Sequence, residues 1–406
     1  MRKLLFLLLL FAVVLPVRAA QQVTVEQLEQ KLAAAHGTRD QALAKQLGDL
    51  ELSERLSTQK LQSIQPGLPG EKSRQALLVL ADASAFLDLP AAEIPAMAPL
   101  DAHTQNLILA KAAEGLVASM HEYPDFSAQE TTSRFHDLKV SYLSRASEPI
   151  ILEHQAFHPL DSFSRIVNYT NGKEVDEPTE MRFGLKRRPR NALSDLGVFG
   201  PLMRTVVTDL YKGKMEWGHW EQRATGPVAV FRYSIPKDGS NYVLKFCCMG
   251  LPGPLAAWHD FESIPPFHGE IAFDPATGAV YRLVLNIDLD PSDPLFLAKI
   301  VVEYEQVEMG GKMYTCPRKS VTITTAIAPT PHYGTCTGSA IETDCTPDRI
   351  FTPKDTVIDD TVYDSYRFIR AAPRMQPAES TAQQDTGQED ESPDADTPSS
   401  STAPKP

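Results

Sequence analysis

Residues 266–327 read PFHGEIAFDPATGAVYRLVLNIDLDPSDPLFLAKIVVEYEQVEMGGKMYTCPRKSVTITTAI and decide the fold of this chain. Apolar and polar side chains alternate along the stretch, as they do in strands whose two faces differ. The alternation breaks at 274–278 (Asp-Pro-Ala-Thr-Gly) and at 309–312 (Met-Gly-Gly-Lys), which are typical turn sequences. The pattern predicts an antiparallel meander with one apolar face, which another element must cover.

Two runs in this stretch define the expected faces. The apolar face is expected to carry Tyr281, Leu283, Leu285, Ile287, Leu289, Ala298, Ile300, Val302 and Tyr304. The intervening positions are polar, and they include Arg282, Asn286, Asp288, Lys299 and Glu303. We therefore expect the second face to be polar and to face solvent.

The segment 22–122 has helical rather than strand periodicity. Residues 24–27 (Thr-Val-Glu-Gln) form a capping-box sequence, and 38–41 (Thr-Arg-Asp-Gln) repeat it. Two longer amphipathic helices are expected over 71–87 and from Asp101 onward. Together these signals predict an N-terminal helical bundle.

Alternating patterns return from residue 128 and continue to about 372, with 355–369 expected as a final strand pair or an edge strand. Residues 194–212 differ, because their wide apolar stripe predicts one helix inside the sheet region. A strongly curved open sheet can wrap around such a helix. The expected fold class is α+β: a helical bundle (22–122), followed by a curved open antiparallel half-barrel (128–372) wrapped on an embedded helix.

Both ends of the chain have distinctive compositions. Residues 1–20 have a basic start, an apolar run over 4–14 and a small-x-small sequence at 17–19, which predicts a cleavable signal peptide. The apolar run is too short to span a bilayer comfortably as an anchor. Residues 373–406 are polar and acidic with almost no large apolar side chain, which predicts a disordered tail. We expect a periplasmic or extracellular protein.

The overall charge and the cysteines limit the possible partners and cofactors. A net charge of −13 disfavours nucleic acid as a partner, because phosphate binding needs concentrated positive charge. No cysteine or histidine spacing matches a metal site, so neither a metal nor a cofactor is expected.

The chain has five cysteines, and disulfide bonds are permitted in an exported protein. Cys336 and Cys345 flank a polar loop and are the expected disulfide pair. Cys247 and Cys248 are adjacent on an expected strand, where one could be buried and one could reach Cys316. The odd count leaves at least one thiol unpaired or intermolecular.

Two sequences carry a resemblance to a known family: 269–278 (GEIAFDPATG) and 304–314 (YEQVEMGGKMY), joined by a long strand. With the signal peptide and the helix at 194–212, they resemble the LolA-like superfamily of bacterial envelope proteins. That superfamily includes outer-membrane lipoprotein carriers and a periplasmic anti-sigma co-regulator. The chain departs from the carrier pattern in its helical domain, its acidic tail and its greater length. The whole chain is also similar to exported proteins of Gram-negative soil bacteria.

The resemblance implies a half-barrel whose apolar face holds a lipid, an acyl group or an apolar segment of a partner. On this interpretation the ligand-lining residues are Leu283, Leu285, Ile287, Ile300, Val302, Leu202 and Val206. The partner would be a lipid or a lipoprotein.

The sequence contains no motif that predicts catalysis, so no catalytic residue is assigned. His268, Glu270 and Asp274 share one side of a strand and could transfer protons, but alternation alone explains their placement. Trp217 and Trp220 indicate a bulge at Gly218 and are expected in the sheet core rather than at a ligand mouth.

Three functions therefore remain open. The first is a non-enzymatic exported protein that binds lipid. The second is an envelope scaffold or signalling protein that acts through residues 22–122 on another envelope protein. The third is an enzyme of unrecognised type. An empty apolar cavity in the half-barrel would favour the first.

Overall fold

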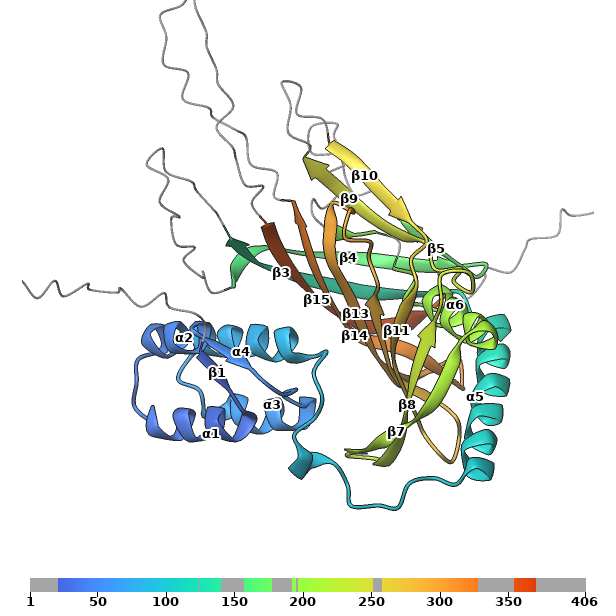
Figure 1. Ribbon diagram of the computed structural model, residues 1–406, viewed down its shortest axis with the longest axis horizontal. Helices are drawn as coiled ribbons and strands as arrows, with labels where there is room; N and C mark the ends of the chain where they lie inside the picture. Colours follow the sequence, from blue (N-terminus) through green and yellow to red (C-terminus); the bar gives the residue numbers. More distant parts are fainter. Residues whose placement is uncertain are drawn as a thin grey trace, which may run out of the picture. The chain divides into compact units, whose positions relative to one another are not determined.

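The computed structural model describes residues 21–122, 124–139, 157–176, 192–194, 196–250, 258–327 and 354–369. These residues form a mixed fold of helices and strands around a large antiparallel sheet of ten strands (Figure 1). The expected signal peptide (1–20), the disulfide between Cys336 and Cys345, and the expected tail (373–406) lie outside the described residues. No helix of the described part combines the length and the apolar character needed to cross a membrane.

The N-terminal helices form a group with its own core, which we call the helical module (residues 21–88). Its elements are β1 (Gln21–Val23), α1 (Val25–Ala34), α2 (Asp40–Gly48), β2 (Leu50–Leu52), α3 (Thr58–Ile64), η1 (Gln65–Gly67) and α4 (Glu71–Ser84). Buried Leu28, Leu47 and Leu77 belong to one apolar cluster inside the module. Burial of these side chains supplies most of the module's stability, because short helices are marginal alone.

The two expected capping boxes have different outcomes. At the first, Thr24 Oγ1 accepts from the Gln27 backbone N–H at 3.2 Å and Gln27 Oε1 accepts from the Thr24 N–H at 3.0 Å, as predicted. The second prediction is wrong, because α2 follows Arg39 and has no side-chain cap.

The predicted meander is confirmed. It consists of β11 (Phe267–Phe273), β12 (Val280–Ile287), β13 (Leu295–Met309) and β14 (Lys312–Ile327), paired in sequence as antiparallel neighbours. At its first turn, Asp274 accepts backbone hydrogen bonds from Ala276 and Thr277, and Gly278 takes a φ of 75°. These are the roles that an Asx-type turn assigns to Asp and Gly.

The whole sheet has the order β5-β4-β3-β15-β14-β13-β12-β11-β8-β7, and its first and last strands do not pair, so it is open. The strands outside the meander are β3 (Phe126–Lys139), β4 (His158–Thr170), β5 (Lys173–Asp176), β7 (Lys214–Arg223), β8 (Gly226–Ile235) and β15 (Lys354–Phe368). A separate small sheet contains β6 (Ala192–Leu193), β9 (Leu244–Gly250) and β10 (Trp258–Ser263).

The last described strand does not lie where the sequence predicted. Residues 355–369 were expected to form a strand pair or an edge, but β15 is a single strand inside the sheet. It pairs with β14 on one side and with β3 on the other. Sequence periodicity identifies a strand but carries no information on which neighbours it joins.

One face of the sheet, which we call the Leu283 face, packs against two helices. α5 (Ala102–Glu122) contributes Ile108 and Ala112 to its core, and α6 (Pro201–Asp209) contributes Leu202 and Val206. α5 therefore packs on the sheet rather than within the helical module, although the sequence grouped it with the helical domain that ends at 122. Figure 1 shows α5 and α6 apart from α1–α4.

α6 is shorter than the helix expected over 194–212. Gly197 and Gly200 have φ values of 63° and 136°, which break the helix before Pro201. Proline at the first helical position then fits, because its missing N–H would have no partner there. A short 3-10 helix, η3 (Leu210–Lys212), ends the segment.

The expectation of a single apolar face is wrong. The opposite face, which we call the Arg282 face, carries Val284, Val301 and Val321 in a second apolar cluster. This cluster includes Val79 of α4 and packs against Phe86, so the helical module covers part of that face. Tyr281 also departs from prediction, because the register shift beside it packs its ring against the cluster of Val228, Val230 and Ala272.

A close approach between three strands depends on Gly269. The Tyr233 hydroxyl donates to the Val284 carbonyl at 2.7 Å, and a Cβ at position 269 would lie 1.8 Å from that carbonyl oxygen. Only glycine allows β8, β11 and β12 to approach so closely at this point.

We expect Leu283→Ala to destabilise the protein by about 2–5 kcal/mol, because it leaves a cavity in the core of the Leu283 face. Urea unfolding followed by circular dichroism measures the effect. Ile166→Ala on the exposed part of β4 is the control, with an expected change below about 0.5 kcal/mol. Equal effects of the two substitutions would contradict the assigned core.

Candidate functional site

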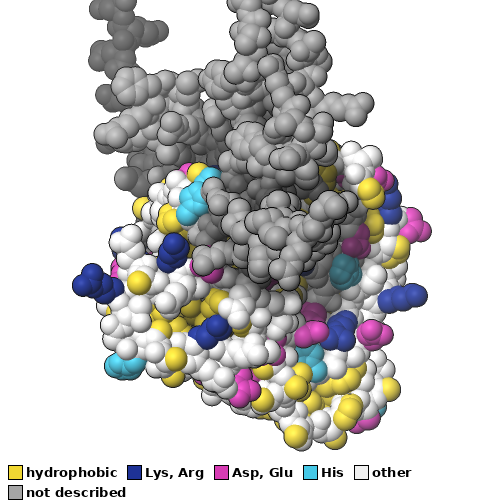
Figure 2. Space-filling view, turned by 60° about the vertical axis from the view of Figure 1, so that its left-hand side comes forward, with side chains coloured by type: hydrophobic (Ala, Val, Ile, Leu, Met, Phe, Trp, Pro, Cys, Tyr) yellow, Lys and Arg dark blue, Asp and Glu magenta, His cyan; other side chains and the backbone are white. Residues whose placement is uncertain are grey.

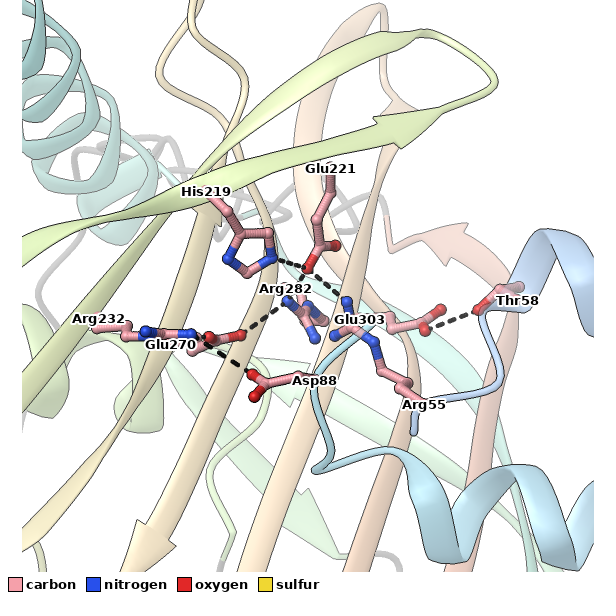
Figure 3. Close-up of polar contacts among 9 residues, drawn as sticks. All are labelled: Arg55, Thr58, Asp88, His219, Glu221, Arg232, Glu270, Arg282 and Glu303. Atoms are coloured by element: carbon pink, nitrogen blue, oxygen red, sulfur yellow. Dashed lines mark hydrogen bonds and ion pairs between the residues drawn. The ribbon is translucent and has the colours of Figure 1, made fainter. Parts of the chain in front are cut away.

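Charged side chains from distant parts of the chain meet between the helical module and the Arg282 face. Figure 3 shows them, and we call the set the junction network. Arg55, Thr58 and Asp88 come from the module; His219, Glu221, Arg232, Glu270, Arg282 and Glu303 come from β7, β8, β11, β12 and β13. The network is the largest group of interacting polar side chains that we consider as a candidate site.

Strand register positions the members of the network. Arg232 is directly opposite Glu270 on the neighbouring strand, and Arg282 is directly opposite Glu303. Directly opposed residues of antiparallel strands project from the same face, which places these charges side by side. On the module, the Arg55 backbone N–H donates to the Asp88 carbonyl at 2.8 Å and ties the loop after α4 to the network.

Glu221 is the centre of the network. Its Oε1 accepts from Arg55 Nη2 and from Arg282 Nη2, both at 2.5 Å, and lies 3.1 Å from His219 Nε2. Burial alone would raise the pKa of the Glu221 carboxyl. The Arg55 charge and the hydrogen bonds from His219 and Arg55 lower the pKa by more than burial raises it. The pKa therefore lies below its usual value, and Glu221 stays ionised.

The outer rim of the network is weaker. Arg232 lies 3.4 Å from both Asp88 Oδ1 and Glu270 Oε1, and its side chain is half exposed. Asp88 is 84% exposed in its side chain. Exposed pairs of this kind contribute about 0–1 kcal/mol, so Asp88 can leave Arg232 at little cost.

A second charged cluster joins α4 to β14 and β15. Lys319 Nζ lies 2.7 Å from Asp82 Oδ1 and 3.1 Å from Asp360 Oδ1. Burial and the Asp360 charge raise the pKa of Asp82 to about 8, and burial also raises the pKa of Asp360. The single ammonium group of Lys319 does not compensate two buried carboxylates. One of the two carboxyl groups therefore tends to keep its proton.

Three members of the junction network have ligand atoms close enough to hold a metal ion. One atom each from His219, Glu221 and Glu270 lies within 4.8 Å of the others. Arg282 Nη2, however, already lies against both carboxylates, and Arg55 binds Glu221. Two guanidinium charges at these oxygens disfavour a further cation, so the donor set fits arginine better than a metal.

A cavity of about 510 Å³ lies next to the network. Its wall on the module side is the loop 85–88, and its other wall is formed by β8, β11 and β12. Arg232, Glu270 and Arg282 belong to both the network and the lining. The cavity therefore gives part of the network access to small molecules.

The residues expected to line a lipid site are brought together, but in the packed core. Leu283, Leu285, Ile287, Ile300, Val302, Leu202 and Val206 all belong to the core cluster of the Leu283 face. Ile287 is the most exposed of them at 7%, and none of them lines the cavity beside the network.

Two aromatic residues behave as predicted. The register of β7 and β8 shifts between Trp217 and His219, which confirms the bulge at Gly218. The Trp217 and Trp220 rings stack edge to face, 5.2 Å apart, and Trp220 is a core residue.

The described cysteines correct one expectation. Cys247 is disulfide-bonded, whereas Cys316 is free and buried. Cys316 therefore forms no disulfide with Cys247 or Cys248, and it is an unpaired thiol of the kind that the odd count predicted. Burial raises the pKa of Cys316 to about 12, so it is an unreactive thiol.

Sequence reasoning missed the network, although part of its signal was present. Arg282 and Glu303 were placed on the polar face, and Glu270 was noted on the same side as His268. We interpreted these alternating charges as a solvated face. Arg55 and Asp82 carried no signal, because nothing in the helical pattern predicts contact with the sheet.

No family model matches the sequence, no curated protein is similar to it, and no solved structure matches its fold. The resemblance to LolA-like proteins therefore stays a prediction.

We expect Glu221→Gln to destabilise the folded protein by about 3–5 kcal/mol, because it leaves Arg55 and Arg282 with reduced charge compensation in a buried site. Urea unfolding of the full chain measures this loss. Glu216→Gln, at an exposed position of the same strand, is the matched control and should cost below about 0.5 kcal/mol. A loss of unfolding free energy no larger than that of the control would show that the network contributes little to the stability of the fold.

The Asp82 cluster predicts a pH dependence. The unfolded chain loses the Asp82 proton near the ordinary aspartate pKa of about 3.9, whereas the folded chain keeps it up to about 8. Stability should therefore fall as the pH rises through this window, because the folded state binds the extra proton. Unfolding free energies measured across the window test this expectation.

Asp82→Asn should flatten that dependence, since an amide carries no titrating proton. Asp88→Asn, on an exposed aspartate of the same module, should leave the slope of the wild type unchanged. Identical slopes for wild type and Asp82→Asn would contradict the assignment of the proton to this cluster.

Proposed function

We propose that the protein is an exported, non-enzymatic scaffold or signalling protein of the cell envelope. In this proposal the sheet is a half-barrel wrapped on α6, and it serves as a platform for the helical module. The module and the segment that follows it, up to residue 100, are the part that binds another envelope protein. The observation that carries the proposal is the burial of the Leu283 face under α5 and α6.

That burial favours a scaffold over a lipid carrier. A carrier needs apolar side chains that an acyl chain can reach. The residues expected to provide them are buried among α5, α6 and the strands, with Leu283, Leu285 and Ile300 at 0% exposure. Aromatic side chains of the core add to this packing, and Phe126 and Phe199 lie 5.7 Å apart between ring centroids.

The contacts of the helical module also support the proposal. Arg55–Glu221, Lys319–Asp82 and the hydrogen bond from Thr58 to Glu303 hold it against the Arg282 face. A scaffold needs its binding surface held in a fixed orientation, and buried charge pairs supply geometric specificity.

The end of the module and the chain that follows it carry exposed apolar side chains. Leu87, Ile94 and Met97 are exposed along the segment 85–100, which includes η2 (Ala91–Glu93). Figure 2 shows apolar and charged side chains interspersed over the described part of its view. Exposed apolar side chains rimmed by charges are typical of protein-binding surfaces.

Site-specific photo-cross-linking in cells tests the proposal. A photoreactive amino acid at Met97, 46% exposed, should cross-link to one defined envelope protein. The same amino acid at Tyr211, 86% exposed on η3, is the control and should not give this product. Absence of a product from Met97, or the same products from both positions, would contradict a role of this segment in partner binding.

Native mass spectrometry of the purified protein separates the scaffold from the lipid carrier. We expect the mass of the polypeptide alone, with no lipid recovered by organic extraction. A lipid that co-purifies with the protein in a one-to-one ratio would favour the lipid carrier over the scaffold.

A further inference from the structure

The cavity beside the junction network has the dimensions of a ligand site. Its volume of about 510 Å³ lies within the range of about 300–1,000 Å³ typical of small-molecule sites. The loop 85–88 and three strands of the sheet enclose it from two sides. A ligand bound there would contact the helical module and the sheet at the same time.

The cavity lining includes an arginine that has an unsatisfied donor. Arg282 is a buried arginine, with 8% of its side chain exposed, and both of its ion pairs use Nη2. Its Nε–H is buried and finds no acceptor among the described residues. An unsatisfied buried donor of this kind costs free energy unless a ligand or solvent supplies an acceptor.

Further donors line the same cavity. Arg232 uses Nε and Nη2 only in contacts of 3.4 Å, which are long for charge-assisted hydrogen bonds. His268 directs Nδ1 toward Asp288, at 3.0 Å from its nearer oxygen, and the described residues provide no hydrogen bond to its Nε2. The lining thus presents a guanidinium group with weakly used donors.

Both carboxylate oxygens of Glu270 in the lining are already engaged. Glu270 accepts from Arg232 through Oε1 and from Arg282 through Oε2. Asp88 is mostly exposed and holds Arg232 weakly. A ligand that brings acceptors complements the two arginines, and an anion can replace Asp88 at Arg232 without changing the local charge balance.

Part of the lining is apolar, beside polar residues such as Ser234 and Asn286. Ala85, Phe86 and Leu87 form the wall on the module side, and Val284 lies on the sheet side. This wall favours a ligand with a short hydrocarbon or aromatic part next to its anionic group.

We propose that the junction cavity binds a small organic carboxylate, whose headgroup meets Arg282 and Arg232 and whose apolar part packs on Phe86 and Leu87. A planar carboxylate matches the fork of a guanidinium group, and two arginines from different strands fix its orientation. The inference goes beyond the scaffold role and does not depend on it.

Isothermal titration calorimetry of the purified full chain tests the inference with two probes, hexanoate and benzoate. We expect saturable one-to-one binding of at least one of them. Hexanamide and benzamide, which keep the shape and lose the charge, should bind at least about tenfold more weakly, because charge-assisted hydrogen bonds are the stronger ones. Hydrogen exchange should slow in the loop 85–88 when the carboxylate is present.

Two variants and one control assign the site. Arg232→Gln removes the half-exposed arginine and should weaken carboxylate binding about tenfold or more. Arg282→Lys keeps the positive charge beside Glu221 and removes the Nε–H donor, and it should also weaken binding. Arg204→Gln, at an exposed position of α6 outside the cavity, should bind as the wild type does.

Three results would overturn the inference. They are no saturable binding of either carboxylate, binding that Arg232→Gln leaves unchanged, and tighter binding of inorganic phosphate than of both carboxylates. Each of them leaves the cross-linking result from Met97 unaffected, so the failure of one proposal can be told from the failure of the other.

Discussion

The carboxylate of Glu221, shared between Arg55 and Arg282, is the interaction on which the arrangement of the chain depends. It connects the helical module with two strands of the sheet that are not neighbours, β7 and β12. Removing three charged groups from water costs free energy. Their mutual attraction compensates this cost only when the groups are well oriented and hydrogen-bonded. The ion pairs of Glu221 with Arg55 and Arg282 therefore favour one relative orientation of the module and the sheet.

Local features of the fold were predictable because they depend on nearby residues. The meander, its turn at Gly278 and the bulge at Gly218 follow from alternation and from turn chemistry. The position of β15 was not predictable, because its pairing with β3 joins segments more than 200 residues apart and leaves no trace in local periodicity. The second apolar face was missed for a related reason, since local alternation carries no information on the helical module that covers Val301 and Val321.

The candidate site was harder to predict than the fold. A charged side chain of a strand can face solvent or face a helix. The sequence shows the same alternation of polar and apolar residues in both cases. Arg282 and Glu303 were therefore identified as polar-face residues, but their burial depends on the contact with Arg55 and Thr58 from another part of the chain. The spare donor of Arg282 is a property of three-dimensional geometry and has no sequence signature.

The internal position of β15 also has a kinetic consequence. During synthesis, β3 and β14 each expose an unpaired edge until residues 354–368 emerge, because β15 is the strand that joins them. Pairings between segments so distant in sequence are slow to form, since a long loop must close before any contact compensates the lost entropy. The polypeptide thus remains incompletely assembled until residues 354–368 are available, and until then its open strand edges make it dependent on protection from aggregation.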